Sequence, residues 1–559
     1  MVAKLGLVGR TLRHLKLIQV VNRIWRKRPM GDVSREGLPV RDGGGMVAFP
    51  CGYSVWDGKT RFTFLNETHE VKFAADWNNQ EWKKLWLYNL HYFDCLRQEG
   101  VRDSASARAP TKRMEAWMGE ASARAPTGRN GAPTGRKESQ ALIERWIDEN
   151  PVGKGNGWEP YPISLRVVNW IKWMVRVEDG ADGVRALPSL AVQVRWLWKR
   201  LEYHLLANHL LANAKALVFA GRFFEGEEAE EWYRKGMAIY RKELPEQVLE
   251  DGVHFERSAM YHLILLDDVL DCYNFTGEEI FKTYAAKMLG ALWILVGPDG
   301  KIVKFNDAAE GIALPVERVR EYAKRLGIES EGTVRAVEPE ARPYRGARQS
   351  GFVRLEKGEI CVIAKMGEIG PSYQPGHAHA DTGTFELWKG TRKIIADTGT
   401  DRYVVDDERK RQRGTSAHNC VMIDGKDSSE VWAGHRVARR CLGVWKFGRL
   451  DGLNCAVCEY RDYHGFRVRR TLTVTDAGLR GIDEVLGKGA HDIELRWHLA
   501  PGVSADEVCV VCRMGGEAVD CVTEPCLICA EFGREVQSAV VIARKRVRLP
   551  VVVGWNVLC

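Results

Sequence analysis

The spacing of apolar positions changes once along the chain, near residue 350. Before that point, apolar residues recur every three or four positions in the runs 81–96, 189–224, 230–244, 258–275 and 278–295. This spacing is typical of amphipathic or buried α-helices, and Gly- and Pro-containing connections separate the runs. Successive helices with short connections predict helical hairpins packed side by side.

After residue 350 apolar and polar residues alternate, in the runs 358–367, 383–399, 418–425, 467–478 and 538–555. Alternation bounded by Gly, Asp and Lys-Gly turns is typical of β-strands. Helices followed by strands predict separate α and β domains. We expect a basic N-terminal segment at 1–60, a helical domain at 61–340 and a β domain at 341–559.

The stretch 104–139 interrupts the helical pattern with low-complexity sequence. ASARAPT occurs at 105–111 and again at 121–127, and GAPTGR follows at 131–136. These segments have too few large apolar side chains to offset the entropy lost on ordering. We therefore expect an insertion on the surface of the helical domain.

The first 28 residues are basic throughout and lack the uninterrupted apolar region and cleavage site of a signal peptide. Their apolar residues recur near helical spacing: Leu5, Leu7, Val8, Leu12, Leu15, Leu17, Ile18 and Val21. Two interpretations stay open, a helix at a membrane surface and a helix packed on the protein body. The sequence contains no run of about 20 apolar residues, so we expect no membrane-spanning helix. We expect a cytoplasmic or membrane-peripheral protein.

Composition narrows the class of partner. The 559 residues carry a formal net charge of +8, which favours an anionic partner. No zinc-finger, RNP-type or basic heptad motif accompanies this charge, so we expect no nucleic acid. The 14 cysteines include three pairs with CxxC spacing. These pairs fall on predicted strands, where positions i and i+3 face opposite sides. We expect these thiols to fill the core, in a reducing compartment.

Histidines and an aspartate gather in the segment 376–418. His377 and His379 are two residues apart, so both point to one face of an extended segment. Asp397 falls on the next predicted strand, and His418 opens a further strand. Two histidines and one aspartate form a donor set suited to Zn²⁺, with the remaining histidine free for proton transfer. The alternative is histidines satisfied by backbone carbonyls.

Polar pairs also interrupt the predicted helices. Asn208 and His209 stand in one apolar helical run, and Tyr261 and His262 stand in another. A buried polar pair costs free energy unless it is hydrogen-bonded or lines a cavity. Pairs on successive helices indicate a shared polar cleft.

Taken together, these segments resemble the heparinase II/III family of polysaccharide lyases. The resemblance runs from about residue 70 to 440 and includes WEPYPISLRVVNWIKW (158–173), HLLANHLLANAKALVFAG and ERSAMYH. It is most specific at 376–425, where GHAHAD and TSAHN occur together. The resemblance implies an incomplete (α/α) toroid followed by an antiparallel β-sandwich. It also implies an acidic, uronic-acid polysaccharide as substrate, cleaved by β-elimination.

The family's functional roles transfer to matching positions of this sequence. Asn208 matches the residue that neutralises the substrate carboxylate, with Asn213 as the second choice. His377 matches the general base and Tyr261 the acid that protonates the leaving oxygen. His379, Asp397 and His418 match ligands of a site-supporting zinc ion. Residues expected to line the sugar cleft are Tyr88, Asn89, His91, Tyr92, Arg166, Asn169, His209 and His262.

Two features depart from the family pattern. Ala378 stands where a glycine is common, and the chain shows no secretion signal, which favours a role in cell-surface polysaccharide production. Two other functions remain open. A glycoside hydrolase would use two carboxyl groups, and the carboxyl groups available are Glu256, Asp267, Asp307 and Glu310. A non-catalytic carbohydrate-binding protein is the third hypothesis.

Overall fold

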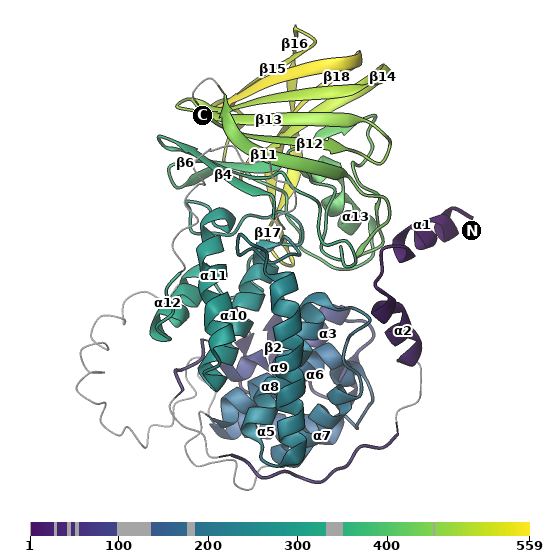
Figure 1. Ribbon diagram of the computed structural model, residues 1–559, viewed down its shortest axis with the longest axis vertical. Coiled ribbons are helices and arrows are strands. Elements are labelled where there is room, and N and C mark those ends of the chain that lie inside the picture. The colour runs from purple at the N-terminus through teal and green to yellow at the C-terminus, as the bar shows by residue number, and fades with distance from the viewer. Residues whose placement is uncertain are drawn as a thin grey trace, which may run out of the picture. The chain divides into compact units, whose positions relative to one another are not determined.

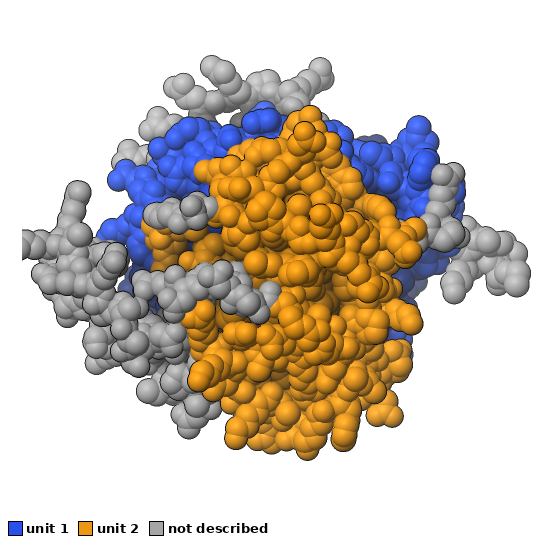
Figure 2. Space-filling view, turned by 90° about the horizontal axis from the view of Figure 1, so that it is seen from below, with its two compact units in different colours: residues 1–30, 202–214, 235–559 blue, residues 31–201, 215–234 orange. Residues whose placement is uncertain are grey.

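The computed structural model describes residues 2–26, 31–41, 46–50, 55–97, 136–175, 185–330, 350–450 and 453–559. These residues form two compact units (Figure 2). Unit 1 contains residues 1–30, 202–214 and 235–559, and unit 2 contains residues 31–201 and 215–234. This division differs from the boundaries that periodicity alone suggested, because several helices group with the β-strands. The expected insertion at 104–139 lies outside the described residues except for its last four positions, where helix α5 begins.

Unit 2 is mainly helical and aromatic at its centre. Its helices are α3 (Lys84–Tyr92), α5 (Arg136–Glu149), α6 (Pro160–Met174), α7 (Ala186–Trp198) and the second half of α8 (Ala207–Phe223). A small antiparallel sheet joins them, made of β1 (Val55–Trp56), β2 (Arg61–Phe64) and β3 (Glu67–Glu70). Trp146 and Trp170 are fully buried with ring centroids 5.6 Å apart. Tryptophans therefore form the core of this unit.

The helices of unit 1 are α1 (Val2–Leu12), α2 (Leu17–Trp25), the first half of α8, most of α9 (Glu227–Gln247), α10 (Ala259–Thr276), α11 (Glu279–Leu295), α12 (Val316–Arg325) and α13 (Asp407–Arg413) (Figure 1). Helix α10 illustrates why they form. Ser258 caps its N-terminus by accepting a hydrogen bond from the Tyr261 amide, and Gly277 ends it in the left-handed conformation. No described helix is both long enough and apolar enough to cross a bilayer.

The apolar run 189–224 forms two helices instead of one. Helix α7 ends at Trp198 and α8 begins at Ala207. Leu206 and Ala207 have φ of 63° and 50°, in the left-handed region that non-glycine residues rarely occupy. The break places Asn208 in the first turn of α8.

The β-strands of unit 1 form two main antiparallel sheets. The four-stranded sheet contains β4 (Phe352–Lys357), β5 (Ile360–Lys365), β6 (Thr384–Lys389) and β7 (Arg392–Ile395) in that order. The nine-stranded sheet contains β8 (Val421–Ile423), β11 (Leu442–Leu450), β12 (Leu453–Arg461), β13 (Arg467–Thr475), β14 (Gly478–His498), β15 (Cys509–Met514), β16 (Glu517–Val519), β17 (Cys521–Glu531) and β18 (Arg534–Leu558). A hairpin of β9 (Val431–Trp432) and β10 (Arg436–Val437) lies outside both.

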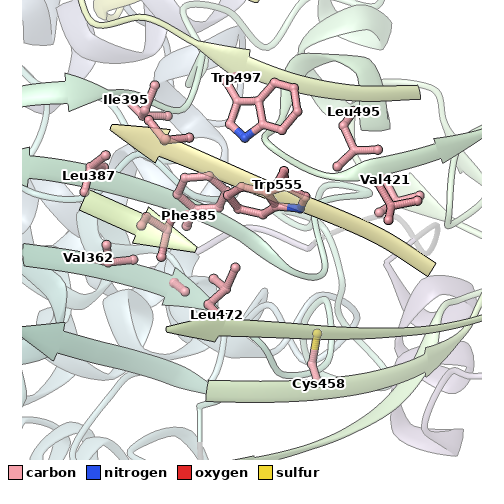
Figure 3. Close-up of a cluster of buried hydrophobic side chains, with 14 of the residues drawn as sticks. Val362, Phe385, Leu387, Ile395, Val421, Cys458, Leu472, Leu495, Trp497 and Trp555 are labelled. Atoms are coloured by element: carbon pink, nitrogen blue, oxygen red, sulfur yellow. The ribbon is translucent and has the colours of Figure 1, made fainter. Parts of the chain in front are cut away.

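Apolar side chains from both sheets meet in one core (Figure 3). Phe385 of β6 stacks on Trp555 of β18 with ring centroids 5.5 Å apart, and Trp497 of β14 meets the same indole edge-on. Of the CxxC thiols, Cys458 of β12 and Cys512 of β15 are buried in this core as predicted, whereas Cys509 is exposed and Cys526 is half-buried. All thirteen described cysteines are free thiols. The expected order of helices followed by antiparallel sheets is confirmed.

Candidate active site

Strained backbone surrounds a buried polar cluster in unit 1. Leu206 and Ala207 precede Asn208, Arg257 follows Glu256 with φ of 55°, and Asn306 precedes Asp307 with φ of 57°. Each such residue costs about 1–3 kcal/mol and persists only where the surrounding structure enforces it. Strain of this kind concentrates at functional sites. Three separate segments of the chain converge here, and each contains a residue with strained backbone.

His377 is the centre of this cluster. Its Nδ1 lies 2.9 Å from Asp307 Oδ2. Its Nε2 lies 3.4 Å from Asn208 Nδ2 and 3.4 Å from Glu256 Oε2. The shorter contact to an ionised carboxylate places the ring proton on Nδ1, which leaves Nε2 as the proton acceptor.

Tyr261 lies directly on the His377 ring. The two rings stack with centroids 3.8 Å apart and an interplanar angle of 27°. The Tyr261 hydroxyl is 3.2 Å from the hydroxyl of Tyr403, in the loop between β7 and α13. Burial, together with Asp307, holds the pKa of Tyr403 well above its ordinary value. The Tyr403 phenol therefore keeps its proton at neutral pH.

Asn208 is held by Glu256 at the start of α8. Its backbone N–H donates to Glu256 Oε1 at 3.2 Å, and its Nδ2 donates to Oε2 at 3.3 Å. Its Oδ1 is buried with no hydrogen-bond partner among the described residues. Burial raises the pKa of Glu256 above its ordinary value, against the opposing effect of His377.

Asp307 joins this cluster to the predicted metal ligands. Arg409 of α13 donates to both of its carboxylate oxygens, and His379 Nε2 lies 2.8 Å from Oδ1. Burial opposes the charge on Asp307, but Arg409 and the two histidines hold its pKa well below the usual range. One ionised carboxylate thus orients both His377 and His379.

The predicted zinc ligands lie beside each other. His418 Nδ1 is 2.8 Å from Asp397 Oδ2, and the His379 and His418 rings are 5.3 Å apart. His379 Nδ1 and His418 Nε2 are buried and have no hydrogen-bond partner among the described residues. Unsatisfied imidazole nitrogens next to a carboxylate fit a cation such as Zn²⁺.

The ligand atoms of this trio are not grouped as closely as those of another set. Among the described residues, Asp307, His377 and His435 have ligand atoms within 4.8 Å of one another, and the predicted trio is not among such groups. In that second set the His377 nitrogen nearest to Asp307 is already occupied by a hydrogen bond. The structure therefore contains groups that could hold a metal, and two of them share this neighbourhood.

Several functional neighbours were not predicted from the sequence. Arg409, Tyr403 and His435 gave no local signal, and Asp307 entered only as a hydrolase carboxylate. Arg409 lies 102 positions from its partner in the chain. The conspicuous segment NDAAEG at 306–311 was the one available clue to Asp307.

Four of the expected sugar-contacting residues, three of them in unit 2, face the core instead. His91, Arg166 and His262 are fully buried, and Asn169 is 3% exposed. Arg166 donates to Gly157 O, His91 O and Gln193 Oε1, at 2.8, 3.2 and 2.8 Å. His262, in unit 1, lies between the His254 amide and Met288 O, and burial lowers its pKa to about 4. Internal groups occupy polar atoms of these residues, and a direct sugar contact stays a prediction for them.

The remaining expected sugar residues are only partly enclosed, with one exception. Tyr88, Asn89 and His209 are half-buried, whereas Tyr92 is 6% exposed. His209 Nδ1 lies 3.3 Å from Glu202 Oε2. Asn213, the second choice for Asn208, is fully buried and donates to the same carboxylate at 3.1 Å, so it supports the α8 turn.

Comparison with known proteins adds family information. The heparinase II/III N-terminus model matches residues 97–325, and the heparinase II/III-like C-terminal model matches residues 339–540. A heparin-sulfate lyase of Bacteroides stercoris is 26% identical over 327 residues, covering 54% of this chain and 47% of that protein. A heparin-sulfate lyase of Bacteroides thetaiotaomicron is 23% identical over 417 residues, covering 66% and 58%. This chain thus spans about half the length of the curated relatives it matches.

Solved structures share the fold. A crystal structure of heparinase III aligns with a TM-score of 0.59 and 18% identity, covering 76% of this chain and 73% of that one. The heparan sulfate lyase HepC from Pedobacter heparinus aligns with a TM-score of 0.52 and 16% identity, covering 88% and 80%. The likeness supports an (α/α) toroid followed by antiparallel β-sheets, as expected from the sequence.

Proposed function

Since this chain belongs to the heparinase II/III family, we propose that it is a polysaccharide lyase that cleaves an acidic, uronic-acid-containing polysaccharide by β-elimination. The observation that carries the proposal is the stack of Tyr261 on His377 at 3.8 Å, with the Asn208 amide 3.4 Å from the same imidazole. From one side of the site, these groups can act as the base, as the acid and as the partner of the substrate carboxylate.

His377 is the proposed base. The Nδ1–H group of His377 donates a hydrogen bond to Asp307, so the Nε2 lone pair is available to take the C5 proton of the uronate. As that proton leaves, electrons form the C4–C5 double bond and the C4–O4 bond breaks. The ionised Asp307 also stabilises the imidazolium that results.

Asn208 is the proposed partner of the substrate carboxylate. Removing a proton next to a carboxylate builds a second negative charge on that group, which needs hydrogen-bond donors placed in advance. The Nδ2 of Asn208 donates to Glu256 in this structure, so the substrate carboxylate must replace Glu256 as its acceptor. Asn208 lies in the first turn of α8, where the helix dipole also favours an anion. Glu256 faces this position, and burial raises its pKa above the ordinary value.

Tyr261 is the proposed acid. Its hydroxyl gives its proton to O4 as the C4–O4 bond breaks, and the proton on His377 restores it afterwards through solvent. The hydroxyl of Tyr403, 3.2 Å away, can hydrogen-bond the phenolate that forms in between.

We also propose that His379, Asp397 and His418 hold Zn²⁺. Their donor types suit this ion, and two unsatisfied nitrogens support the assignment. The ion would fix the segments around His377 in place. Each proton transfer is assigned to His377 and Tyr261.

The hydrolase alternative loses Asp307, one of its four candidate carboxyl groups. It needs a carboxyl group free to act as nucleophile or base. Both oxygens of Asp307 are occupied by Arg409 and the histidines. Its depressed pKa also excludes it as the acid.

The test is ultraviolet absorbance during incubation with heparan sulfate, alginate and hyaluronan, because elimination creates an absorbing C4–C5 double bond. We expect absorbance to rise with at least one polymer, to vanish in Tyr261→Phe and to persist in the control Tyr284→Phe on α11. New reducing ends without absorbance would indicate a hydrolase. Neither signal with any polymer of a wider uronate panel would favour a binding protein.

A further inference from the structure

Helix α2 has its polar side toward the protein and its apolar side toward solvent. On the inner side, Gln19 is fully buried and donates to Leu205 O at 3.3 Å and Tyr373 O at 3.5 Å. Arg26, at its end, contacts the His204 ring. A helix on the surface of a soluble protein has the opposite arrangement.

The outer side is a continuous apolar stripe. Leu17, Val20, Val21 and Ile24 are 78%, 40%, 40% and 66% exposed. Their spacing of i, i+3, i+4 and i+7 places them on one face of the helix. Of the 19 exposed large apolar residues in the described chain, seven belong to α1, α2 and their vicinity at residues 8–25. The stripe is therefore a local concentration and not ordinary surface scatter.

This orientation is fixed by contacts that do not involve the stripe. Arg10 of α1 donates to both oxygens of Glu430 at 3.1 and 2.9 Å. Trp432 Nε1 donates to Thr11 Oγ1 at 3.2 Å, and Lys16 binds Glu246. The helices are held to unit 1 by their polar groups, so the apolar face stays outward.

The same segment holds the charge excess of the whole protein. Residues 1–28 contain eight Lys and Arg and no Asp or Glu, and the formal net charge of the chain is +8. The other residues are therefore electrically balanced. Burial and Arg436 lower the pKa of Arg23, and Arg440 repels Arg13 across the surface. A cluster of like charges attracts an anionic surface.

We propose that α1 and α2 dock this protein on an anionic lipid bilayer, with the apolar stripe inserted at headgroup depth and the exposed Arg13 facing the phosphates. Basic residues beside an outward apolar face are the two features such surfaces recognise. A second copy fits less well, because it would bring the same positive charge. It would also need about 800 Å² on each partner, and α2 is only about 14 Å long. The inference does not depend on the proposed lyase activity.

The test is co-sedimentation of the full-length chain with vesicles of phosphatidylcholine alone or with 30% phosphatidylglycerol. We expect binding to the anionic vesicles that weakens at high salt. The double variant Leu17→Ser, Ile24→Ser should lower the bound fraction at least fivefold, and Arg13→Gln about twofold. The matched control is Leu442→Ser, Val444→Ser on β11, whose side chains are 68% and 70% exposed and whose binding should stay unchanged.

Thermal melts of all variants verify folding. The proposal is overturned if the wild type remains in the supernatant with anionic vesicles, or if the α2 double variant sediments like the wild type. A concentration-dependent dimer that the double variant abolishes, without vesicle binding, would overturn it in favour of a second copy.

Discussion

Two buried polar clusters look alike in the sequence and differ in the structure. The cluster in unit 2 is built on Arg166, and every polar group named for it meets a complementary internal group. The cluster in unit 1 is built on His377 and Asp307. It keeps unsatisfied atoms on Asn208, His379 and His418, and strained backbone flanks it.

The difference distinguishes residues that stabilise the fold from residues that can act on a substrate. A satisfied cluster lowers the free energy of the fold and has no donor or acceptor left for a ligand. An unsatisfied and strained cluster costs free energy, which the rest of the fold must offset. We therefore expect changes in unit 2 to affect stability and changes around His377 to affect activity.

The largest expected effect is on activity. His377→Ala should lower the elimination rate by about 10²–10⁴-fold, the usual contribution of a general base. The melting temperature should change little, because the side chain contributes to a strained site. The rate is measured by double-bond absorbance, with His464→Ala on the exposed β12–β13 turn as control. A large drop in melting temperature with retained rate would erase the distinction between the clusters.

The opposite pattern is expected in unit 2. Arg166→Leu should lower the free energy of unfolding by about 3–5 kcal/mol, because it leaves buried carbonyl oxygens without donors. Activity per folded molecule should persist. Denaturant unfolding measures the loss, and Arg222→Leu on the exposed side of α8 is the control. Full stability with lost activity would place Arg166 in the substrate site.

A smaller effect sharpens the comparison through pH. Burial raises the folded-state pKa of Glu256, so its favourable contribution is present at low pH and is lost as pH rises through the folded pKa. Glu256→Gln should therefore exceed the wild type in unfolding free energy at pH 8, on the order of 1 kcal/mol, with the gap closing toward pH 4. Denaturant unfolding curves of both proteins from pH 4 to pH 8 measure this difference in unfolding free energy. A difference that grows toward acidic pH would contradict a raised pKa of Glu256 in the folded state.

The smallest effect concerns the N-terminal helices. Burial opposes the charge on Glu430, but Arg439 and Arg10 lower its pKa to about 2. Their contribution is present above the ordinary pKa of 4.5 and is lost as pH falls toward 2. Arg10→Ala should lower the unfolding free energy by about 0.5 kcal/mol at pH 7 and by clearly less at pH 2, where Glu430 is partly protonated in the folded state. An equal loss at both pH values would mean that Arg10 acts by packing.

The sequence predicted the order of the fold and the centre of the site. The change of period near residue 350 separated helices from strands, and the motifs around His377, Tyr261 and Asn208 identified side chains that the structure brings together. The prediction of the fold succeeded because periodicity is a property of short segments, and the local motifs that indicated these side chains are short as well.

The rest depended on tertiary contacts. The pairing of Arg409 with Asp307 joins positions 102 residues apart and leaves no trace in either segment. The polar residues His91 and Arg166 on apolar helices fit a cleft wall and a core equally well, and only their internal partners decide between them. Periodicity identified Leu17 and Val21 of the α2 stripe but not Val20 or Ile24, and it gave no information on which side would face the protein.

The two bonds of Gln19 have a mechanical consequence. They tie α2 to the backbone at Leu205 and Tyr373, which precede Asn208 and His377 by three and four residues. A force on α2 is therefore transmitted through one amide to both segments that carry the proposed charge acceptor and base.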